Sequence, residues 1–412
     1  MSAFGSRAED LDRDDPLADF REAFALPEGV IYLDGNSLGP PPLAALEDLN
    51  EAAHEAWGQG LVRSWNTAGW IDAPTRLGDR LAGLIGADPG EVIVADSTSV
   101  NLFKLLVAAL QARPERTVVL SEPGDFPTDL YMAQGAVRTL GGGRRLDLRE
   151  PEDLEAALGP DTAVLLLGHV HYKSGRVRDM AGLTARAQAA GALVLWDLSH
   201  SGGVLPVELN ACNVDLAVGC TYKYLSGGPG APAYLFVAKR HQDSLISPLG
   251  GWMGHAQPFA FEDGYAPAEG IRRFACGTPP ILSLTGLEAG AALALRAGPA
   301  RLAAKARALG DLFIEVIEAG PAAAALSLAS PRDSGERGGQ VSFRHPQAYA
   351  IVQALIARGV IGDFRAPDIC RFGFSPLFLS FAEVEAAAEM LGEVVAERVY
   401  EDPAYSVRTA VT

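Results

Sequence analysis

Between residues 91 and 237, short apolar runs alternate with segments of helical periodicity, and this pattern limits the possible folds more than any other feature of the chain. Apolar runs of strand length separated by helices are typical of a mainly parallel sheet with helices on both faces. Ligands of such sheets bind outside the carboxyl ends of the strands. The predicted strands are Glu91–Ala95, Thr117–Leu120, Ala163–Leu167, Ala192–Trp196, Asp215–Cys220 and Ala233–Val237, and the predicted helices between them are Val100–Gln111, Thr128–Gly135 and Met180–Ala190.

A second alternating section follows a long Ala- and Leu-rich helical stretch, Leu282–Ala319, which Gly298-Pro299 interrupts. A new series of strands and helices after a long connecting helix predicts a smaller C-terminal α/β domain. We therefore expect an N-terminal segment (residues 1–55) packed partly on the small domain, a large domain (residues 56–292) and the small domain (residues 293–412). The strands predicted for the small domain are Gly339–Phe343 and Cys370–Phe374, and its helices are Pro346–Arg358 and Ala382–Tyr400.

The charge balance restricts the partners of the chain. Against 34 Lys and Arg residues stand 51 Asp and Glu residues, which gives a formal net charge of −17. Nucleic acids and anionic membranes both require a basic surface, so we expect neither partner. The cysteines Cys212, Cys220, Cys276 and Cys370 form no CxxC pair, so we expect reduced thiols and no metal site. The N-terminus is acidic and lacks the apolar core of a signal peptide, so the expected location is the cytoplasm.

Two charged residues follow apolar strands that are neighbours in the sequence. Asp197 comes directly after the strand Ala192–Trp196, and Lys223 follows the strand Asp215–Cys220 and precedes a glycine-rich segment. By itself Asp197 fits a solvated turn or a helix cap, and by itself Lys223 fits a lysine that reaches solvent at the rim of the sheet. Together they suit pyridoxal phosphate, because a carboxylate holds its ring nitrogen protonated and a lysine holds its aldehyde.

This cofactor also needs an anion site and, in many proteins, an aromatic ring. The segment 96–99, Asp-Ser-Thr-Ser, lies between a predicted strand and a predicted helix, where hydroxyl groups and backbone amides meet a phosphate at the helix N-terminus. The same segment also fits an ordinary N-cap. Phe126, after the next strand, is placed to stack on the cofactor, although an aromatic residue is more often part of a core.

The motifs of the chain, taken in order, resemble those of the kynureninase family, which are fold-type-I enzymes of the class-V aminotransferase-like group. They are YLDGNSLG at residues 32–39, DSTSVNLFKLL, FPTD, DLSHSGG, TYKYLSGGPG, GGWMGH and FACGTPPIL, and they span nearly the whole chain. The resemblance implies a large domain with a mainly parallel, seven-stranded sheet and a smaller C-terminal α/β domain.

The resemblance also implies a reaction. It is the hydrolysis of L-kynurenine to anthranilate and L-alanine with pyridoxal 5′-phosphate as cofactor, in tryptophan catabolism and the supply of NAD precursors. The segment Ser64–Trp70 resembles the bacterial branch of the family and leaves open whether 3-hydroxy-L-kynurenine, which would give 3-hydroxyanthranilate, is also a substrate.

The resemblance assigns roles residue by residue. Lys223 matches the lysine that binds the cofactor aldehyde, Asp197 the partner of the ring nitrogen, and Tyr222 a phosphate contact that we also expect to relay protons. Arg371 matches the arginine that binds the substrate α-carboxylate, a task that suits a guanidinium fork. Trp252 and Thr278 match residues that the neighbouring subunit supplies in this family. We therefore expect a homodimer with shared active sites. The remaining cofactor contacts that we expect are Thr98, Ser99, Phe126, Asp129, Gly168 and His200. Beyond the matched positions, we expect substrate contacts at Asn36, Trp65 and Asn66, with the rings of Trp65 and Trp252 placed to stack on the aromatic ketone.

Other functions are compatible with parts of the sequence. A cysteine desulfurase or an aminotransferase would share the cofactor, but a desulfurase needs a mobile catalytic cysteine, and neither Cys276 nor Cys370 lies in a segment typical of a mobile loop. A module that binds pyridoxal phosphate without catalysis would release no anthranilate. A nucleotide-binding protein would carry GxGxxG or GxxxxGKS/T after a strand, and no predicted strand is followed by either.

Overall fold

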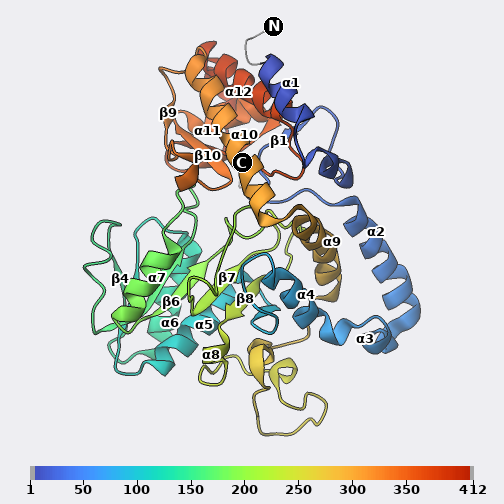
Figure 1. Ribbon diagram of the computed structural model, residues 1–412, viewed down its shortest axis with the longest axis vertical. Helices are drawn as coiled ribbons and strands as arrows, with labels where there is room; N and C mark the ends of the chain where they lie inside the picture. Colours follow the sequence, from blue (N-terminus) through green and yellow to red (C-terminus); the bar gives the residue numbers. More distant parts are fainter. Residues whose placement is uncertain (1–4, 409–412) are drawn as a thin grey trace.

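The computed structural model describes residues 5–408, and a seven-stranded sheet forms the lower of its two lobes in Figure 1. The strand order is β2-β8-β7-β6-β5-β3-β4, and within this sheet only β8 runs antiparallel to its neighbours. The predicted α/β fold with a mainly parallel sheet is therefore confirmed. The strands are β2 (Val92–Val94), β3 (Val118–Ser121), β4 (Arg145–Leu148), β5 (Thr162–Gly168), β6 (Leu193–Asp197), β7 (Leu216–Gly219) and β8 (Tyr234–Val237).

Alternating side chains of each strand belong to two different apolar cores, one on each face of the sheet. In β5, Val164 and Leu166 pack with residues of α5 (Thr98–Ala112) and α6 (Pro127–Leu140). Leu165 and Leu167 pack instead with residues of α4 (Ala73–Ala82) and α7 (Met180–Ala189). A strand that is buried on both faces needs apolar residues at every position, which is why these strands stand out in the sequence. The edge strand β4 escapes prediction because it is only partly buried and carries Arg and Asp.

A helical arm and a broken helix flank the sheet. α2 (Leu43–Glu51) continues directly into the π-helix η2 (Ala52–Gly60), and α9 (Ile281–Ala297) packs beside α2. α9 and α10 (Pro299–Ala319) meet at Gly298, whose φ is +80°, with a bend of 86° between the two helices. The predicted break at Gly298-Pro299 is confirmed. Across residues 5–408, no single helix is long and apolar enough to cross a membrane, and the bent pair α9–α10 meets that test only by length and composition.

A second sheet of four antiparallel strands, in the order β12-β13-β10-β9, forms the upper lobe in Figure 1. β1 (Ile31–Tyr32) pairs in parallel with β11 (Val360–Ile361), so the segment that carries DGNSLG lies beside this lobe. α1 (Gly5–Arg13) packs on α12 (Phe381–Ala396). The domain limits at residues 55 and 292 stay a prediction. The other elements of the lobe are β9 (Ser327–Leu328), β10 (Gln340–Arg344), β12 (Asp363–Arg365), β13 (Ile369–Gly373) and α11 (Ala348–Ile356).

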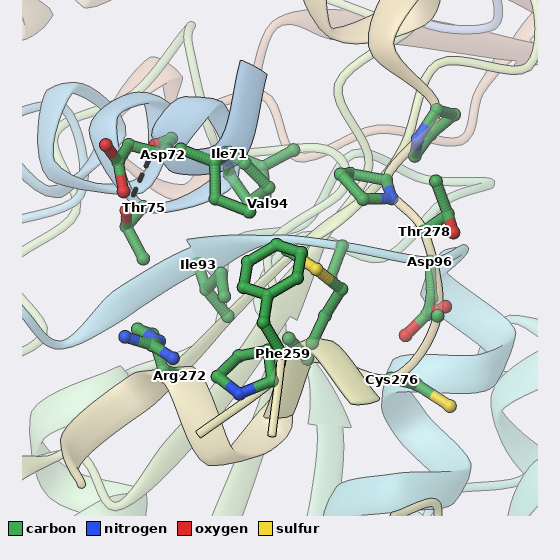
Figure 2. A pocket seen from close by; sticks show the side chains of 18 residues that line it. Ile71, Asp72, Thr75, Ile93, Val94, Asp96, Phe259, Arg272, Cys276 and Thr278 are labelled. Carbon is green, nitrogen blue, oxygen red and sulfur yellow. Dashed lines mark hydrogen bonds between the residues drawn. The ribbon is translucent and has the colours of Figure 1, made fainter. Parts of the chain in front are cut away.

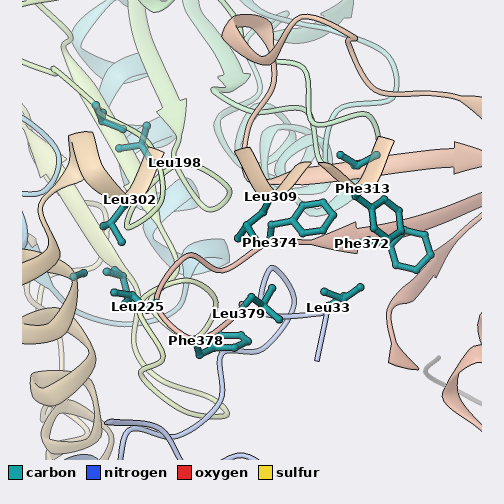
Figure 3. Packing of buried hydrophobic residues seen from close by; sticks show 14 of the residues in the cluster. Leu33, Leu198, Leu225, Leu302, Leu309, Phe313, Phe372, Phe374, Phe378 and Leu379 are labelled. Carbon is teal, nitrogen blue, oxygen red and sulfur yellow. The ribbon is translucent and has the colours of Figure 1, made fainter. Parts of the chain in front are cut away.

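One apolar core joins the two lobes (Figure 3). Leu198 and Leu225, which lie in the loops after β6 and β7, belong to the same buried cluster as Phe313 of α10 and Phe372 of β13. The ring centroids of Phe313 and Phe372 are 5.0 Å apart. The loops at the ends of β6 and β7 are therefore held in a fixed position relative to β13.

Candidate active site

The carboxyl ends of β5, β6 and β7 meet at one edge of the large sheet. Gly168 at the end of β5 is paired with Asp197, and Asp197 is paired with Val218 of β7. Asp197 is buried, and its Oδ1 accepts hydrogen bonds from the Ser199 N–H at 2.8 Å and from the Ser199 hydroxyl at 2.6 Å. The structure thus places the predicted residues Gly168 and Asp197 side by side, in the position where ligands of such sheets bind.

Lys223 lies in the turn after β7, with its amine inside the site. Its Nζ is 2.9 Å from Nε2 of His200, 5.8 Å from the ring centroid of Phe126 and 6.0 Å from that of Tyr222. Burial, together with the nearby charge of Lys223, lowers the pKa of His200 well below its ordinary value. The imidazole is therefore neutral and can accept a hydrogen bond from the amine. Four residues that the sequence pointed to thus form one cluster.

The loop of the DGNSLG motif packs directly against the Lys223 turn. Gly39 donates its N–H to the carbonyl oxygen of Tyr222 at 2.7 Å. A Cβ atom at Gly39 would lie 2.3 Å from the carbonyl oxygen of Lys223, so a larger residue does not fit there. Asn36, buried in the same loop, donates from Nδ2 to Oε1 of Gln340 at 3.3 Å. This loop connects the backbone around Lys223 with the small sheet.

Two carboxyl groups lie together near Lys223. Asp129, in the first turn of α6, has both carboxylate oxygens buried without a hydrogen-bond donor among the described residues. Burial raises the pKa of Asp129 well above its ordinary value, and the charge of Asp197 raises it further. Burial also raises the pKa of Asp197. Two buried acids beside a single lysine amine call for a further cationic or proton-donating partner.

The unpaired atoms of the site fit pyridoxal phosphate. A protonated ring nitrogen is the kind of partner that the two acids lack, and a lysine amine binds an aldehyde. The hydroxyl of Thr98 and Nδ1 of His200 are also buried without a partner in the described chain. Within residues 5–408, no three His, Cys, Asp or Glu side chains gather as metal ligands would.

The loop at residues 96–97 leads into the N-terminus of α5. Ser97 caps the helix by accepting the N–H of Val100 at 3.3 Å, and Thr98 and Ser99 form the first turn. The free N–H groups of such a turn attract a phosphate. The predicted phosphate position therefore has the local structure that it requires.

The buried Lys104 anchors this loop through its amine. Its Nζ lies 2.7 Å from Oδ2 of Asp96 and 2.7 Å from the carbonyl oxygen of Phe274. Burial lowers the pKa of Lys104, and the charge of Asp96 opposes that shift. Asp96 itself has a left-handed backbone with φ of +52°. Lys104 was not among the predicted site residues, although a lysine inside the apolar run VNLFKLL is a signal that could have identified it.

Arg371 lies fully buried on β13, opposite Asp363 of β12. Its Nε donates to Oδ1 of Asp363 at 2.8 Å and its Nη2 pairs with Oδ2 of the same carboxylate. Nη2 also donates to the Ser37 hydroxyl at 2.9 Å, and Nη1 donates to the carbonyl oxygen of Tyr172 at 2.7 Å. A guanidinium has five N–H donors, so about one is left for a ligand. The two parallel donors Nε and Nη2, which were expected to bind the substrate carboxylate, are bound to Asp363 instead.

Three predicted residues lie away from the Lys223 cluster within the single chain. Trp65 and Asn66 are on the short helix α3 (Ser64–Thr67), at the far end of the helical arm in Figure 1. The ring of Trp65 packs edge-on against Trp70, with 5.8 Å between centroids. Trp252, in η5 (Trp252–Gly254), packs in the same way against Phe259 at 5.6 Å.

Thr278 lines a cavity of about 190 Å³ beside the loop at residues 96–97, which precedes α5 (Figure 2). Asp96 lies on the same side of this cavity, and its other walls are largely apolar, with Ile93 and Phe259 among them. Lys223 is not one of the lining residues. Thr278 thus lines a cavity to which Lys223 does not contribute.

Solved structures with a similar fold define the class of protein. The apo structure of a cysteine desulfurase from Thermococcus onnurineus NA1 superposes with a TM-score of 0.76 at 22% identity and covers 94% of this chain and 98% of its own. A C-DES mutant with glycine covalently linked to its PLP cofactor gives a TM-score of 0.78 at 19% identity, covering 90% of this chain and 98% of its own. At these identities the similarity shows the fold alone, which is that of the class-V, fold-type-I enzymes.

Sequence comparison identifies the family within this class. The kynureninases of Pseudomonas fluorescens and of Burkholderia pseudomallei strain 1106a are each 51% identical to the chain, over 407 and 409 residues, and in both cases the match covers 98% of this chain and 98% of the relative. A family model described as the kynureninase C-terminal domain matches residues 302–391. The chain belongs to the kynureninase family. The cofactor predicted from the sequence, pyridoxal phosphate, is the cofactor of this family.

Proposed function

We propose that the chain hydrolyses L-kynurenine to anthranilate and L-alanine, with pyridoxal phosphate held at Lys223. The observation that carries this proposal is the cluster at the ends of β6 and β7, where the Lys223 amine lies 2.9 Å from His200 and close to the unpaired carboxyl group of Asp129. Because the chain is 51% identical to a kynureninase over nearly its whole length, we assign the reaction of that family to this cluster.

The residues of the chain divide the work among them. When bound, pyridoxal phosphate would supply an aldehyde carbon, to which the substrate is joined through its amine nitrogen, and a pyridinium ring that withdraws electrons from the substrate α-carbon. Asp197 holds the proton on the ring nitrogen, and Lys223 holds the aldehyde and then carries the proton of the substrate α-carbon. Neutral His200 accepts a hydrogen bond from the Lys223 amine and so orients it.

Tyr222 is the proton donor that we propose for the later steps. Burial raises the pKa of Tyr222 above its ordinary value, so the hydroxyl keeps its proton. Arg371 binds the substrate α-carboxylate through the donor that Asp363 and Tyr172 leave free. Cofactor contacts at Thr98, Ser99, Phe126 and Gly168, and a substrate contact at Asn36, belong to the same proposal.

The direct test is incubation of the holoenzyme with L-kynurenine while anthranilate fluorescence is recorded. We expect fluorescence to rise and L-alanine to form in equal amount, because one cleavage gives both products. Lys223→Ala is the matched control, since it removes the amine and leaves the surrounding fold. A holoenzyme that binds the cofactor and releases no anthranilate would contradict the proposal, and 3-hydroxy-L-kynurenine tested in parallel would decide the substrate preference.

The fold similarity to cysteine desulfurases gives a second candidate function, which the burial of Cys220 and Cys370 disfavours. Cys370 is fully buried in β13 and its thiol donates to the carbonyl oxygen of Ala348. Cys220 is also buried, next to Ser199. A desulfurase needs a cysteine that can reach the substrate sulfur, so release of sulfide from L-cysteine at a rate comparable to kynurenine cleavage would revive this candidate.

We infer that two copies of the chain form a homodimer whose active sites are shared. Apolar side chains are exposed along the arm, with Trp57 at 59% and Val62 at 76%, and Phe261 is exposed at 77% in the segment after Trp252. Exposed apolar groups in such number mark an interaction surface. In the dimer, Trp252 and Thr278 of one subunit would complete the site of the other, and Trp65 and Asn66 would line the pocket for the aromatic ketone.

Light scattering of the holoenzyme tests the dimer. The measured mass should be twice that of the 43.3 kDa chain. Val62→Glu should lower this mass and the activity together, because it places a charge in the proposed contact. We also propose that the enzyme works in the cytoplasm, and its four free cysteines agree with a reducing compartment.

A further inference from the structure

A compact group of charged residues surrounds Arg371 on the side of the small sheet. Asp363 and Arg365 lie two residues apart on β12, and Asp363 is paired across the sheet with Arg371 of β13. Asp34 reaches the end of β13 through a backbone bridge to Gly373. Two acids and two arginines from three segments of the chain thus meet in one place.

The two acids differ in their partners. Asp363 accepts hydrogen bonds from Nε of Arg371 at 2.8 Å, from Nη2 of Arg365 at 2.5 Å and from the Ser37 hydroxyl at 2.8 Å. Oδ1 of Asp34 is buried without any donor among the described residues. Asp363 therefore takes the positive charges, and Asp34 is left beside a carboxylate. A second carboxyl group in that position is stable when it holds a proton.

We propose that Asp34 is a positioning residue for Arg371 that holds a proton in the working enzyme, and that its ionisation weakens binding of the substrate α-carboxylate. The inference rests on the proposed function, in which Arg371 contacts that carboxylate. With Asp34 protonated, two guanidinium groups stand against one carboxylate, and one positive charge remains for the substrate. With Asp34 ionised, the group is neutral and its attraction for an anion is lost.

The electrostatics of the group agree with this assignment. Burial and the charge of Asp363 raise the pKa of Asp34 to about 7, although Arg371 and Ser37 oppose the shift. Burial alone would also raise the pKa of Asp363, but Arg371 and Arg365 lower it below its ordinary value. Asp363 is therefore the ionised member of the pair at neutral pH, and Asp34 the one that titrates.

Two tyrosines complete the surroundings of Asp34. Tyr32 comes from β1 and Tyr224 from the turn after β7. Burial raises the pKa of each phenol above its ordinary value, so both keep their protons while Asp34 titrates. The charged and titratable groups that face Asp34 are thus Asp363 and Arg365 of β12, Arg371 of β13, Tyr32 and Tyr224.

Replacing Asp34 by Asn removes the charge of the side chain and leaves the backbone of the loop unchanged. The carbonyl oxygen of Asp34 accepts the N–H groups of Ser37 at 2.9 Å and of Leu38 at 3.1 Å, and these bonds do not involve the side chain. Asp34→Asn keeps the shape and the backbone contacts but cannot ionise. Asp34→Ser, which also cannot ionise, is measured alongside it.

The experiment measures the inhibition constant of 4-oxo-4-phenylbutanoate on the holoenzyme at several pH values. This probe has the carboxylate and the aromatic ketone of the substrate but no amine, so its own charge stays constant. In the wild type the inhibition constant should rise about tenfold between about pH 6 and about pH 8.5, as one unit of charge is lost nearby. In Asp34→Asn it should stay near the low-pH value throughout. Asp368→Asn, which neutralises the half-buried partner of Arg344 just before β13, should titrate like the wild type.

Different failures have different meanings in this design. If both Asp34 variants bind the probe with the pH dependence of the wild type, while Arg371→Ala loses binding, Asp34 has no such role and the carboxylate site stands. If Arg371→Ala binds the probe as well as the wild type does, the carboxylate site is wrong and the role of Asp34 with it. Infrared difference spectra give a readout that a structural role would not move. The band of a protonated carboxyl group should be lost as the pH rises in the wild type and not in Asp34→Asn.

Discussion

The two ends of the candidate active site differ in how their buried polar groups are paired. Near Lys223, both carboxylate oxygens of Asp129 and the hydroxyl of Thr98 have no partner in the described chain. Arg371, at the other end, is bound to Asp363, Ser37 and Tyr172. An unpaired buried group costs free energy, so the first end is completed by its ligand, whereas most donors of Arg371 at the second end are paired before any ligand arrives. The cofactor thus completes the first end, and at the second end the substrate carboxylate meets the one donor of Arg371 that the protein leaves free.

The largest effect is expected at the unpaired end. Lys223→Ala should lower turnover by a factor on the order of 1,000 or more, because the variant has neither the group that holds the aldehyde nor the base that carries the α-proton. The visible absorbance of the lysine-bound cofactor should disappear as well. Lys239→Ala, which removes an exposed lysine paired with Asp88, is the control and should behave as the wild type. Normal turnover of Lys223→Ala would refute the assignment.

Removal of the cofactor tests whether this end depends on its ligand. The unfolding temperature of the apoenzyme should lie well below that of the holoenzyme, since a ligand at 1,000 times its dissociation constant stabilises the native state by about 4 kcal/mol. Calorimetry of the two forms at equal protein concentration measures the difference. Equal unfolding temperatures would mean that the unpaired atoms around Asp129 and Thr98 do not contact the cofactor.

At the paired end, the expected effect is on the substrate alone. Arg371→Ala should raise KM by about 100-fold, which corresponds to the lower part of the cost of about 2–5 kcal/mol for truncating one member of a buried charge pair. Cofactor absorbance should remain close to that of the wild type, and steady-state kinetics with a cofactor titration measure both. Arg344→Ala, on the neighbouring strand β10, is the matched control. Comparable losses of substrate and cofactor affinity would show that the two ends are not separate.

Asp215, which lies away from both ends of the site, shows what a fully hydrogen-bonded carboxylate contributes to the stability of the fold. Asp215, before β7, accepts from Arg240 at 2.7 Å and from the Val194 N–H at 3.0 Å, and its Oδ1 lies 2.7 Å from Nε2 of His241. Burial alone would raise the pKa of Asp215, but the hydrogen bonds from His241 and its other partners lower it below the ordinary value.

A carboxyl group with a lowered pKa in the folded state stabilises the protein above its unfolded pKa and loses this effect as the pH falls. Asp215→Asn should therefore reduce the free energy of unfolding by about 1–3 kcal/mol at neutral pH, and by less below about pH 4. Urea unfolding at both pH values measures the change. Asp161→Asn, at an exposed position before β5, should have little effect at either pH.

The sequence was sufficient for the unpaired end because its signals are local. β6 and β7 are apolar at nearly every position since both of their faces are buried, and Asp197 and Lys223 stand where these strands end. Two such positions, read together, were enough to indicate the cofactor. Phe126 followed from its position after the next strand and His200 from the family motifs, and the structure brings both close to Lys223.

The paired end could not be predicted in the same way, because its contacts depend on register and on distant segments. Asp363 meets Arg371 only through the antiparallel pairing of β12 with β13, and Ser37 comes from a loop more than 300 positions away in the chain. Neither partner carries a local signal. The proposed roles of Trp65 and Trp252 depend on a second copy of the chain, so the fold of a single chain does not place them in the site.

The core that joins the lobes also limits how the protein can be divided. The family model begins at residue 302, inside α10, where Leu302 and Leu309 belong to the same buried cluster as Leu198 and Leu225 beyond that boundary. A fragment expressed from residue 302 onward would expose this apolar surface to water and aggregate. For the same reason, a substitution that enlarges a side chain on one side of this contact destabilises the fold unless a smaller residue on the other side makes room for it.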